Sequence, residues 1–260
     1  MLIFTSDKKR LIEHFRKEPA LFAYHIGDLD DFHFQHCQWG ATYGKSPRID
    51  DCILVYNGLK TPTVLAFGLT EKFQRLLETF IPLFPKKFHC HYQEPSRELL
   101  CGLMKGTDLG SHYKMALQEF TPHDDAIEGV EFLTLDESHL DDLLKLYTEA
   151  FPDNYFMPRM LESGKYLAAK CDGRMVAVAG VHVDSDDYKV AALGNITTHP
   201  EYRGRGIATL LTSRLTGQLV AEGKLVCLNV DRENPAAIHC YEKLGFAIVH
   251  EYLEATFELQ

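Results

Sequence analysis

The sequence predicts a mixed α/β protein that is built from two similar units. Helix-like and strand-like patterns alternate along the chain, and this alternation restarts after a polar segment with a proline at residues 121–125. The chain has 260 residues, which is enough for two small domains or one large one at ~150 residues per domain. We therefore expect a junction near residues 121–126, with one domain over 1–122 and the other over 127–260.

The composition is that of a globular protein with an acidic balance. Apolar residues make up 45% and charged residues 25% of the chain, which excludes low-complexity and disordered architectures. The 37 acidic and 27 basic residues give a net charge of −10. Such a chain repels a phosphate backbone, so we expect no nucleic acid as a partner. No run approaches the ~18 consecutive apolar residues of a membrane helix, so we expect no membrane span.

The N-terminus and the cysteines predict a cytoplasmic protein. The first ten residues place their charges after a very short apolar stretch, the reverse of a secretory signal. The seven cysteines are scattered and never spaced as C-x-x-C, which is typical of reduced thiols. A strand over residues 88–92 would send His89 and His91 to one face and Cys90 to the other, so we expect no metal site there.

In the first half, apolar spacing predicts each element in turn. Leu11, Ile12 and Phe15 mark a short amphipathic helix, and Asn57-Gly58 marks a hairpin between two strands. In order, the patterns predict helices over 7–17 and 21–29, strands over 37–43, 52–56 and 63–67, a helix over 71–80, a strand over 87–92, a helix over 96–104 and a strand over 112–120. No glycine-rich phosphate loop occurs in this half.

The second half repeats the alternation and adds one glycine-bearing loop. The patterns predict a strand over 130–135, a helix over 138–151, a short helix after Pro158, strands over 166–171, 175–183 and 188–198, a helix over 207–222, a strand over 225–230, a helix over 235–244 and a strand over 246–250. The loop lies between the strand that ends near Pro200 and the helix that starts at Ile207.

This loop has the features of an anion site. The first amides of a helix lack intrahelical acceptors and the helix dipole is positive there, so an anionic group satisfies both. Gly204 and Gly206 let the backbone approach such a group, and Arg203 and Arg205 add positive charge. The alternative is an ordinary strand-to-helix turn with surface arginines.

A second motif follows at residues 234–246. Asn234 fits a helix N-cap with Pro235 as the first helical residue, and Gly245 fits the left-handed position at the helix end. Tyr241 falls on the same helix face as Ala237. The alternative is that Tyr241 is only a core aromatic and Asn234 only a cap.

The order and spacing of the two motifs resemble the GNAT acyltransferase superfamily over residues 127–256. The motifs are Arg-x-x-Gly-x-Ala at 203–208 and Asn-x-x-Ala-x-x-x-Tyr-x-x-x-Gly-Phe at 234–246. The resemblance implies two GNAT-like domains, each a mostly antiparallel twisted sheet flanked by helices, with a degenerate N-terminal domain. Residues 24–29 are similar to two-domain bacterial relatives and to glycine N-acyltransferase-like proteins.

The resemblance also implies a function. Members move an acyl group from coenzyme A to an amine, so we expect an N-acetyltransferase with acetyl-CoA as cosubstrate, no metal, and a small-molecule amine or amino acid as acceptor, by direct attack in a ternary complex. Tyr241 corresponds to the general acid of the family. The cofactor-binding residues it implies are Ile196, Thr198, Arg203, Gly204, Arg205, Gly206, Ile207, Ala208, Thr209, Asn234 and Ala237.

The proton acceptor and the amine pocket are left open by the sequence. The strand over 190–196 has no carboxylate, so Glu149, His182, Asp184 or a water relay are alternatives for accepting the proton of the amine. The aromatic segment 151–158 either lines the acceptor pocket, with Asp153 as a counter-charge, or is a turn packed by its own aromatics. Two other classes of function stay open: a coenzyme A-binding sensor without turnover, and a scaffold whose first domain binds a partner.

Overall fold

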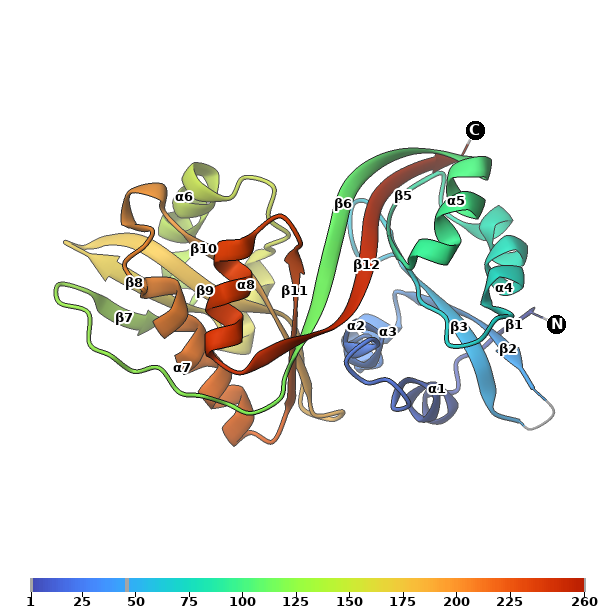
Figure 1. Cartoon of the computed structure of the whole chain (residues 1–260), viewed down its shortest axis with the longest axis horizontal. Coiled ribbons are helices and arrows are strands. Elements are labelled where there is room, and N and C mark those ends of the chain that lie inside the picture. The colour runs from blue at the N-terminus through green and yellow to red at the C-terminus, as the bar shows by residue number, and fades with distance from the viewer. Residues whose placement is uncertain (1, 45–46, 260) are drawn as a thin grey trace. The chain divides into compact units, whose positions relative to one another are not determined.

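The computed structural model describes residues 2–44 and 47–259, and the contacts within it divide the chain into two compact units (Figure 1). The first unit comprises the chain up to Lys114, Val230–Glu233 and the residues from Ile248 onward. The second comprises Met115–Asn229 and Asn234–Ala247. This division differs from the expected domains 1–122 and 127–260 chiefly at the C-terminus, because the last strand completes the sheet of the first unit.

The first unit is a sheet with the strand order β1-β2-β3-β4-β5-β12-β6. Neighbouring strands are antiparallel from β1 to β4 and between β5 and β12, whereas β4 and β5 are parallel. β6 and β12 each contribute residues to both units. The elements are β1 Leu2–Phe4, α1 Lys8–Phe15, α2 Ala23–Gly27, α3 Asp31–Phe34, β2 Cys37–Tyr43, β3 Ile49–Tyr56, β4 Thr63–Ala66, α4 Phe73–Phe80, η1 Ile81–Leu83, β5 Lys87–Tyr92, η2 Glu94–Ser96, α5 Arg97–Leu103, β6 Met104–Leu117 and β12 Phe246–Leu259.

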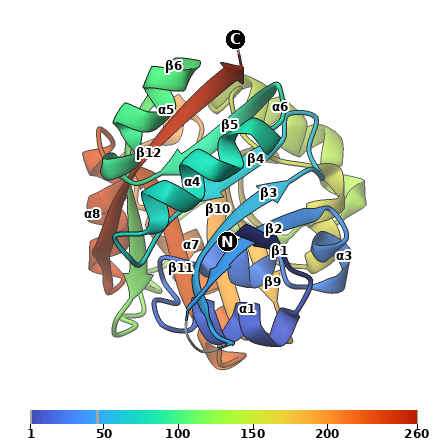
Figure 2. The same ribbon diagram turned by 90° about the vertical axis from the view of Figure 1, so that its right-hand side faces the viewer.

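Helices cover both faces of this first sheet (Figure 2). On one face α4 and α5 bury Phe80 and Leu100 in a core that includes Phe88 and Phe257 of the strands. On the other face the ring of Trp39 lies 5.5 Å from that of Phe15 on α1. Successive strand residues point to opposite faces of a sheet. Because apolar residues occur on both faces here, both can be buried beneath helices.

The second unit has the strand order β11-β10-β9-β8-β7, in which only β10 and β11 are parallel among the described pairings. The apolar stripe of α7, with Leu211 and Leu215 fully buried, packs on β8, β9 and β10. The elements are β7 Glu131–Thr134, η3 Glu137–His139, α6 Leu140–Ala150, η4 Pro158–Ser163, β8 Leu167–Cys171, β9 Arg174–Ser185, β10 Val190–Thr198, η5 Pro200–Tyr202, α7 Ile207–Ala221, β11 Leu225–Asp231 and α8 Pro235–Lys243.

Most predicted elements are confirmed, and the largest differences concern the two long strands. β6 begins at Met104 instead of residue 112, and β12 continues to Leu259 instead of residue 250. β12 pairs with β5 from Leu253↔Tyr92 to Glu258↔Lys87. Its length therefore depends on a partner strand more than 150 residues away in the sequence, which local patterning does not reveal. The helix predicted after Pro158 is the 3-10 helix η4.

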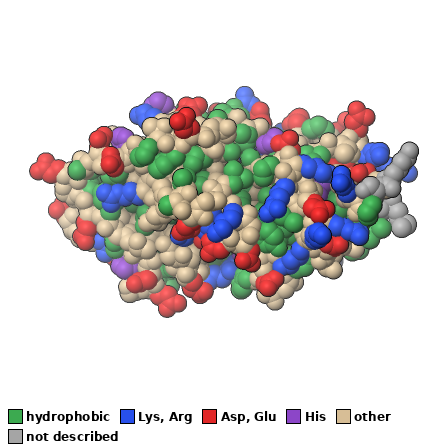
Figure 3. Space-filling model, turned by 90° about the horizontal axis from the view of Figure 1, so that it is seen from below, with side chains coloured by type: hydrophobic (Ala, Val, Ile, Leu, Met, Phe, Trp, Pro, Cys, Tyr) green, Lys and Arg blue, Asp and Glu red, His purple; other side chains and the backbone are tan. Residues whose placement is uncertain are grey.

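The described part of the chain offers neither a membrane-spanning helix nor a metal-binding cluster. None of its helices is long and apolar enough to cross a membrane. No group of three or more His, Cys, Asp or Glu side chains within residues 2–44 and 47–259 is arranged to hold a metal ion. On the face shown in Figure 3, basic side chains are intermingled with acidic ones rather than forming one basic field.

Each unit contains one strand–loop–helix–strand segment whose two strands are parallel: β4–α4–β5 and β10–α7–β11. In the first unit the loop amides are already bound by the chain itself. The Leu69 and Thr70 amides donate to Oδ1 of the fully buried Asp51 at 2.8 and 3.1 Å, and the Thr70 hydroxyl donates to Oδ2. The Gly68 amide donates to Oε1 of Gln93 at 2.9 Å. The carboxylate of Asp51 therefore serves as the internal acceptor for this loop.

We expect Asp51→Ala to lower the free energy of unfolding by about 2–4 kcal/mol, because two loop amides and a hydroxyl lose a buried charged acceptor. Urea unfolding measures this change. The neighbouring Asp50, which is half-buried and only 3.9 Å from the ammonium of Lys72, provides the matched control, and Asp50→Ala should cost less than about 1 kcal/mol. Equal losses in the two variants would contradict the role of Asp51.

Candidate functional site

The candidate site begins where β10 stops pairing with β11. Within the described residues their parallel register runs only from Val190↔Leu225 to Leu193↔Leu228, although β10 continues to Thr198 and β11 to Asp231. On its other side, the register of β10 with β9 shifts between Gly194 and Thr197, which is a β-bulge. The end of β10 can therefore offer peptide groups to an extended ligand that lies between the two strands.

Asn195 forms the bulge and is held there by three tyrosines. Its φ is +53°, in the left-handed region that asparagine adopts more readily than most residues other than glycine. The Tyr147 hydroxyl donates to the Asn195 carbonyl at 3.0 Å, and Asn195 Nδ2 donates to the Tyr166 hydroxyl at 2.9 Å. The Tyr155 amide donates to Asn195 Oδ1 at 3.3 Å. The bulge is therefore fixed by buried hydrogen bonds and not only by the sheet.

The loop after β10 presents uncapped helix amides. Gly204 and Gly206 have φ values of +76° and +78°, and Gly206 is the N-cap of α7 without a side-chain cap. The first helical bond runs from the Leu210 amide to the Gly206 carbonyl at 3.0 Å, which leaves the amides of 207–209 without intrahelical acceptors. A Cβ at either glycine would meet nothing within 4 Å. The loop therefore has both the donors and the open space that a bound anion requires.

The two arginines of the loop are partly engaged by its backbone. Arg203 Nε donates to the Thr198 carbonyl at 3.0 Å, and Arg205 donates to the Glu201 carbonyl at 3.1 Å while its guanidinium lies 4.8 Å from the Tyr202 ring. A pocket of about 420 Å³ lies beside the loop. It is lined by Tyr202, Arg205 and Ile207, and by parts of the segments 127–130 and 171–172.

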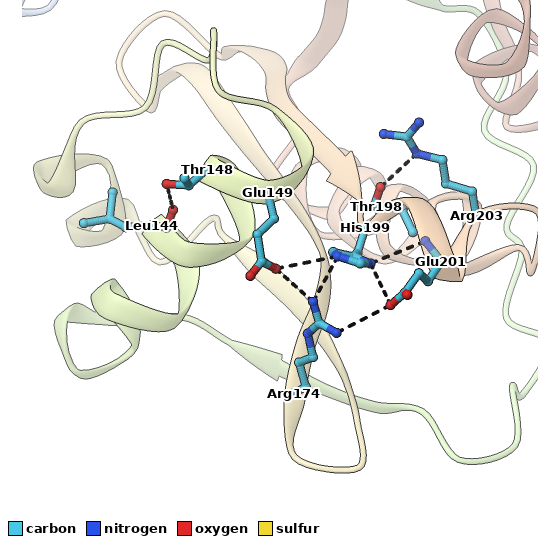
Figure 4. Close-up of polar contacts among 8 residues, drawn as sticks. All are labelled: Leu144, Thr148, Glu149, Arg174, Thr198, His199, Glu201 and Arg203. Atoms are coloured by element: carbon cyan, nitrogen blue, oxygen red, sulfur yellow. Dashed lines mark hydrogen bonds and ion pairs between the residues drawn. The ribbon is translucent and has the colours of Figure 1, made fainter.

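A four-residue ion-pair cluster braces the start of the loop. Figure 4 shows Arg174 of β9 between Glu149 of α6 and Glu201 of η5, at 2.9 and 3.6 Å, and beside His199. Arg174 Nη2 also donates to His199 Nε2 at 2.9 Å. The hydrogen bond from Arg174 lowers the pKa of Glu149. A more strongly ionised, paired carboxylate is a weaker proton acceptor, which disfavours Glu149 as the base.

Asp184 is neutralised by a buried lysine. The side chain of Lys224 is fully buried and forms ion pairs with Asp184, with Asp186 at 2.9 Å and with Glu222 at 2.9 Å. Burial alone would lower the pKa of Lys224, but the hydrogen bonds to the three carboxylates raise it above its ordinary value. Among the residues that the sequence suggests as the base, His182 differs in lying against the bulged strand: a Cβ at Gly194 would be 2.4 Å from its ring.

The second motif forms the helix that the sequence predicts. Asn234 Oδ1 accepts from the Ala237 amide at 3.1 Å, which confirms the N-cap, and Gly245 has a φ of +94°. α8 packs on α7, where Cys240 Sγ lies 3.2 Å from Thr209 Oγ1. Tyr241 is 8% exposed, and burial raises the pKa of its phenol above the ordinary value. The phenol therefore stays protonated at neutral pH.

The segment 151–158 is in part a packed turn. The Phe156 ring lies 5.4 Å from that of Tyr147 and 5.5 Å from that of Tyr166, whereas Asp153 is exposed. The sequence pointed to this segment but not to the roles of Asn195, Tyr147 and Arg174. One local signal existed for the bulge, because a glycine followed by asparagine inside a predicted strand is typical of a left-handed irregularity.

Comparisons with known proteins show what the second half of the chain is similar to. Residues 132–246 match the family model described as "Acetyltransferase (GNAT) family". An acetyltransferase of Pectobacterium atrosepticum is 38% identical over 85 residues, which are 32% of this chain and 58% of that protein. Spermidine N(1)-acetyltransferase of Escherichia coli is 32% identical over 98 residues, which are 37% of this chain and 52% of that protein. The chain thus spans about half the length of these relatives.

Solved structures match nearly the whole chain. A tandem GNAT protein from the clavulanic acid biosynthesis pathway has a TM-score of 0.58 at 13% identity, covering 99% of this chain and 98% of that one. A GCN5-related N-acetyltransferase from Sphaerobacter thermophilus has a TM-score of 0.63 at 15% identity, covering 99% and 95%. At these identities the matches show the fold alone. They confirm the prediction of a mixed α/β fold with two GNAT-like units.

We expect the Lys224 cluster to make stability depend on acid pH. Lys224 lowers the pKa of Asp186 below its ordinary 3.8, and Lys165 together with Lys224 lowers the pKa of Glu222 below its ordinary 4.5. The stabilisation is therefore complete above about pH 4.5 and is lost as the pH falls through the lowered values. In Lys224→Met, urea unfolding between pH 3 and 7 should give a shallower decline below pH ~4.5 and a free energy about 2–4 kcal/mol lower at neutral pH.

The exposed pair of Lys87 with Glu258 supplies the control, because Lys87→Met removes a lysine from a solvated ion pair and should change little. An acid profile of Lys224→Met that is parallel to that of the unaltered protein would contradict this account.

Proposed function

We propose that the chain transfers an acetyl group from acetyl-CoA to the primary amine of a small molecule or amino acid, a function that the match of residues 132–246 to the GNAT acetyltransferase family model supports. The observation that supports this most is that β10 stops pairing with β11 after Leu193 and is followed by the uncapped amides of α7. An extended thioester with an anionic pyrophosphate has the hydrogen-bonding groups and the charge that unpaired strand peptides and uncapped helix amides can bind.

The residues of the loop fit the coenzyme. The pyrophosphate would accept from the amides of Ile207, Ala208 and Thr209, close to the open space at Gly204 and Gly206. The pantetheine arm would pair with the backbone of Ile196 and Thr198, and its far side would face Asn234 and Ala237 at the start of α8. Arg203 and Arg205 supply positive charge in a chain of net charge −10.

The chemistry requires a polarised carbonyl and a proton for the leaving thiolate. The Ile196 amide, which lies in the bulge beside Asn195, would donate to the thioester oxygen as the amine nitrogen attacks. The new C–N bond forms while the C–S bond breaks, and Tyr241 gives its proton to the thiolate. Burial raises the pKa of this phenol, so the proton is present at neutral pH.

The amine must also lose a proton. Arg174 and Lys224 hold Glu149 and Asp184 as ion pairs. We therefore assign the proton of the amine to His182, whose ring lies over Gly194 beside the bulge. An imidazole is suited to this because it can accept a proton near neutral pH.

A cationic amine is the acceptor class that the charge of the chain favours. The net charge of −10 attracts cations over long distances, and the exposed Asp153 offers a local counter-charge beside the aromatic segment 151–158. One relative of the chain is named a spermidine N(1)-acetyltransferase. A panel of amines and polyamines is therefore the first set of acceptors to test.

The test combines binding and turnover. Acetyl-CoA should raise the melting temperature of the protein, and a cationic amine in the panel should release free thiol from acetyl-CoA. Gly206→Glu should abolish the thermal shift, because it places a carboxylate and a strained φ of +78° at the anion site. Gly223→Glu is the matched control, since Gly223 has a φ of +74° and open space at the other end of α7.

Two outcomes would contradict parts of this proposal. Binding of acetyl-CoA without thiol release for any amine would favour a coenzyme A sensor, which the absence of a carboxylate at residues 190–196 already makes the second candidate. An equal thermal shift in Gly206→Glu and Gly223→Glu would remove the loop from the coenzyme site.

Tyr241→Phe should lower kcat about 10²-fold while leaving the affinity for acetyl-CoA unchanged, because only the leaving thiolate needs the phenolic proton. Steady-state thiol release and calorimetric binding measure the two quantities. Tyr92→Phe, which removes a buried hydroxyl in the first unit, should leave both unchanged. A kcat within twofold of the unaltered enzyme would refute the assignment of Tyr241 as general acid.

A further inference from the structure

Asn195 differs from the other residues with a left-handed backbone. Among the described residues other than glycine, only Asp172, Lys189 and Asn195 have positive φ values. Asp172 and Lys189 lie in the turns that precede β9 and β10, where such a conformation reverses the chain. Asn195 instead lies inside β10 and is 3% exposed. Glycine would adopt the same backbone without strain, so the asparagine side chain must be accounted for by its contacts.

These contacts reach two parts of the proposed reaction site. Asn195 Oδ1 accepts from the Tyr155 amide at 3.3 Å, within the aromatic segment 151–158. Asn195 Nδ2 donates to the Tyr166 hydroxyl at 2.9 Å, and that hydroxyl donates to the Val181 carbonyl of β9 at 3.1 Å. The side chain thus connects the aromatic segment to the bulge and, through Tyr166, to the strand that carries His182.

The backbone of Asn195 is fixed from a different direction. Tyr147 of α6 donates to its carbonyl oxygen at 3.0 Å. In a planar trans peptide the N–H points opposite to the carbonyl oxygen. Holding the Asn195 oxygen therefore also sets the direction of the Ile196 amide, the group assigned above to the thioester oxygen.

We propose that Asn195 is a positioning residue that couples the aromatic segment 151–158, beside which the amine would bind, to the peptide that polarises the thioester. This inference rests on the proposed acetyl transfer. The Asn195 side chain fixes the position of the segment 151–158. The Asn195 carbonyl oxygen, which Tyr147 holds, fixes the direction of the Ile196 amide. One residue therefore aligns the two reactants with each other, and neither the coenzyme loop nor Tyr241 takes part in this alignment.

The test is Asn195→Gly, which keeps the left-handed backbone available and removes only the side chain. We expect the KM for the amine to rise about tenfold and kcat to fall about tenfold, with the affinity for acetyl-CoA within twofold of the unaltered protein. Tyr147→Phe should lower kcat but leave the KM for the amine within twofold, because it affects only the peptide. Lys189→Gly is the matched control: the same substitution at a φ of +55° in an exposed turn should change neither constant.

Hydrogen exchange separates failure of this inference from failure of the proposed function, because it needs no turnover. The Tyr155 amide and its neighbours in 151–158 should exchange at least tenfold faster in Asn195→Gly than in Lys189→Gly. Should Asn195→Gly fail to fold, Asn195→Asp keeps the Oδ1 acceptor and should retain both the slow exchange and the KM. Unchanged exchange and unchanged KM in the glycine variant, or faster exchange in the aspartate variant, would overturn the coupling.

Discussion

A backbone N–H that leaves water needs an acceptor, and the two strand–loop–helix segments of this chain meet that need differently. Around the loop between β4 and α4, the carboxylate of Asp51 accepts from two amides and the side chain of Gln93 accepts from a third. The loop between β10 and α7 leaves the first amides of the helix without a side-chain cap, and a Cβ at Gly204 or Gly206 would meet nothing within 4 Å. Similar segments therefore differ in how their amides are satisfied: by the chain itself in the first unit, and by the proposed coenzyme in the second.

Ion pairs engage charged side chains of the second unit. Arg174 engages Glu149, and Lys224 engages Asp184. The hydrogen bond from Arg174 also lowers the pKa of Glu149, which makes this carboxylate a weaker proton acceptor. Beside the bulge lie the imidazole of His182 and the hydroxyls of Tyr147 and Tyr166, which act through hydrogen bonds more than through net charge.

Local sequence signals predicted the parts of the site whose residues lie close together in the sequence. The glycine loop, the helix after it and the Asn234 cap each depend on residues a few positions apart, and all three have the expected backbone conformation. The bulge at Asn195 was missed because its partners Tyr147 and Tyr155 are 48 and 40 residues away in the sequence. β12 was predicted too short for the same reason, since its partner β5 lies in the other half of the chain.

The assignment of Ile248 and the following residues to the first unit has a consequence for biosynthesis. A ribosome makes the other strands of the first unit long before β12, which buries Leu253, Ala255 and Phe257 in the core of that unit. Until then the edge of β5 lacks its partner, so the first unit cannot reach its final structure during the early stages of translation. The first unit can complete its folding only after the C-terminal strand has been synthesised. Folding of the first unit therefore depends on translation of the whole second unit.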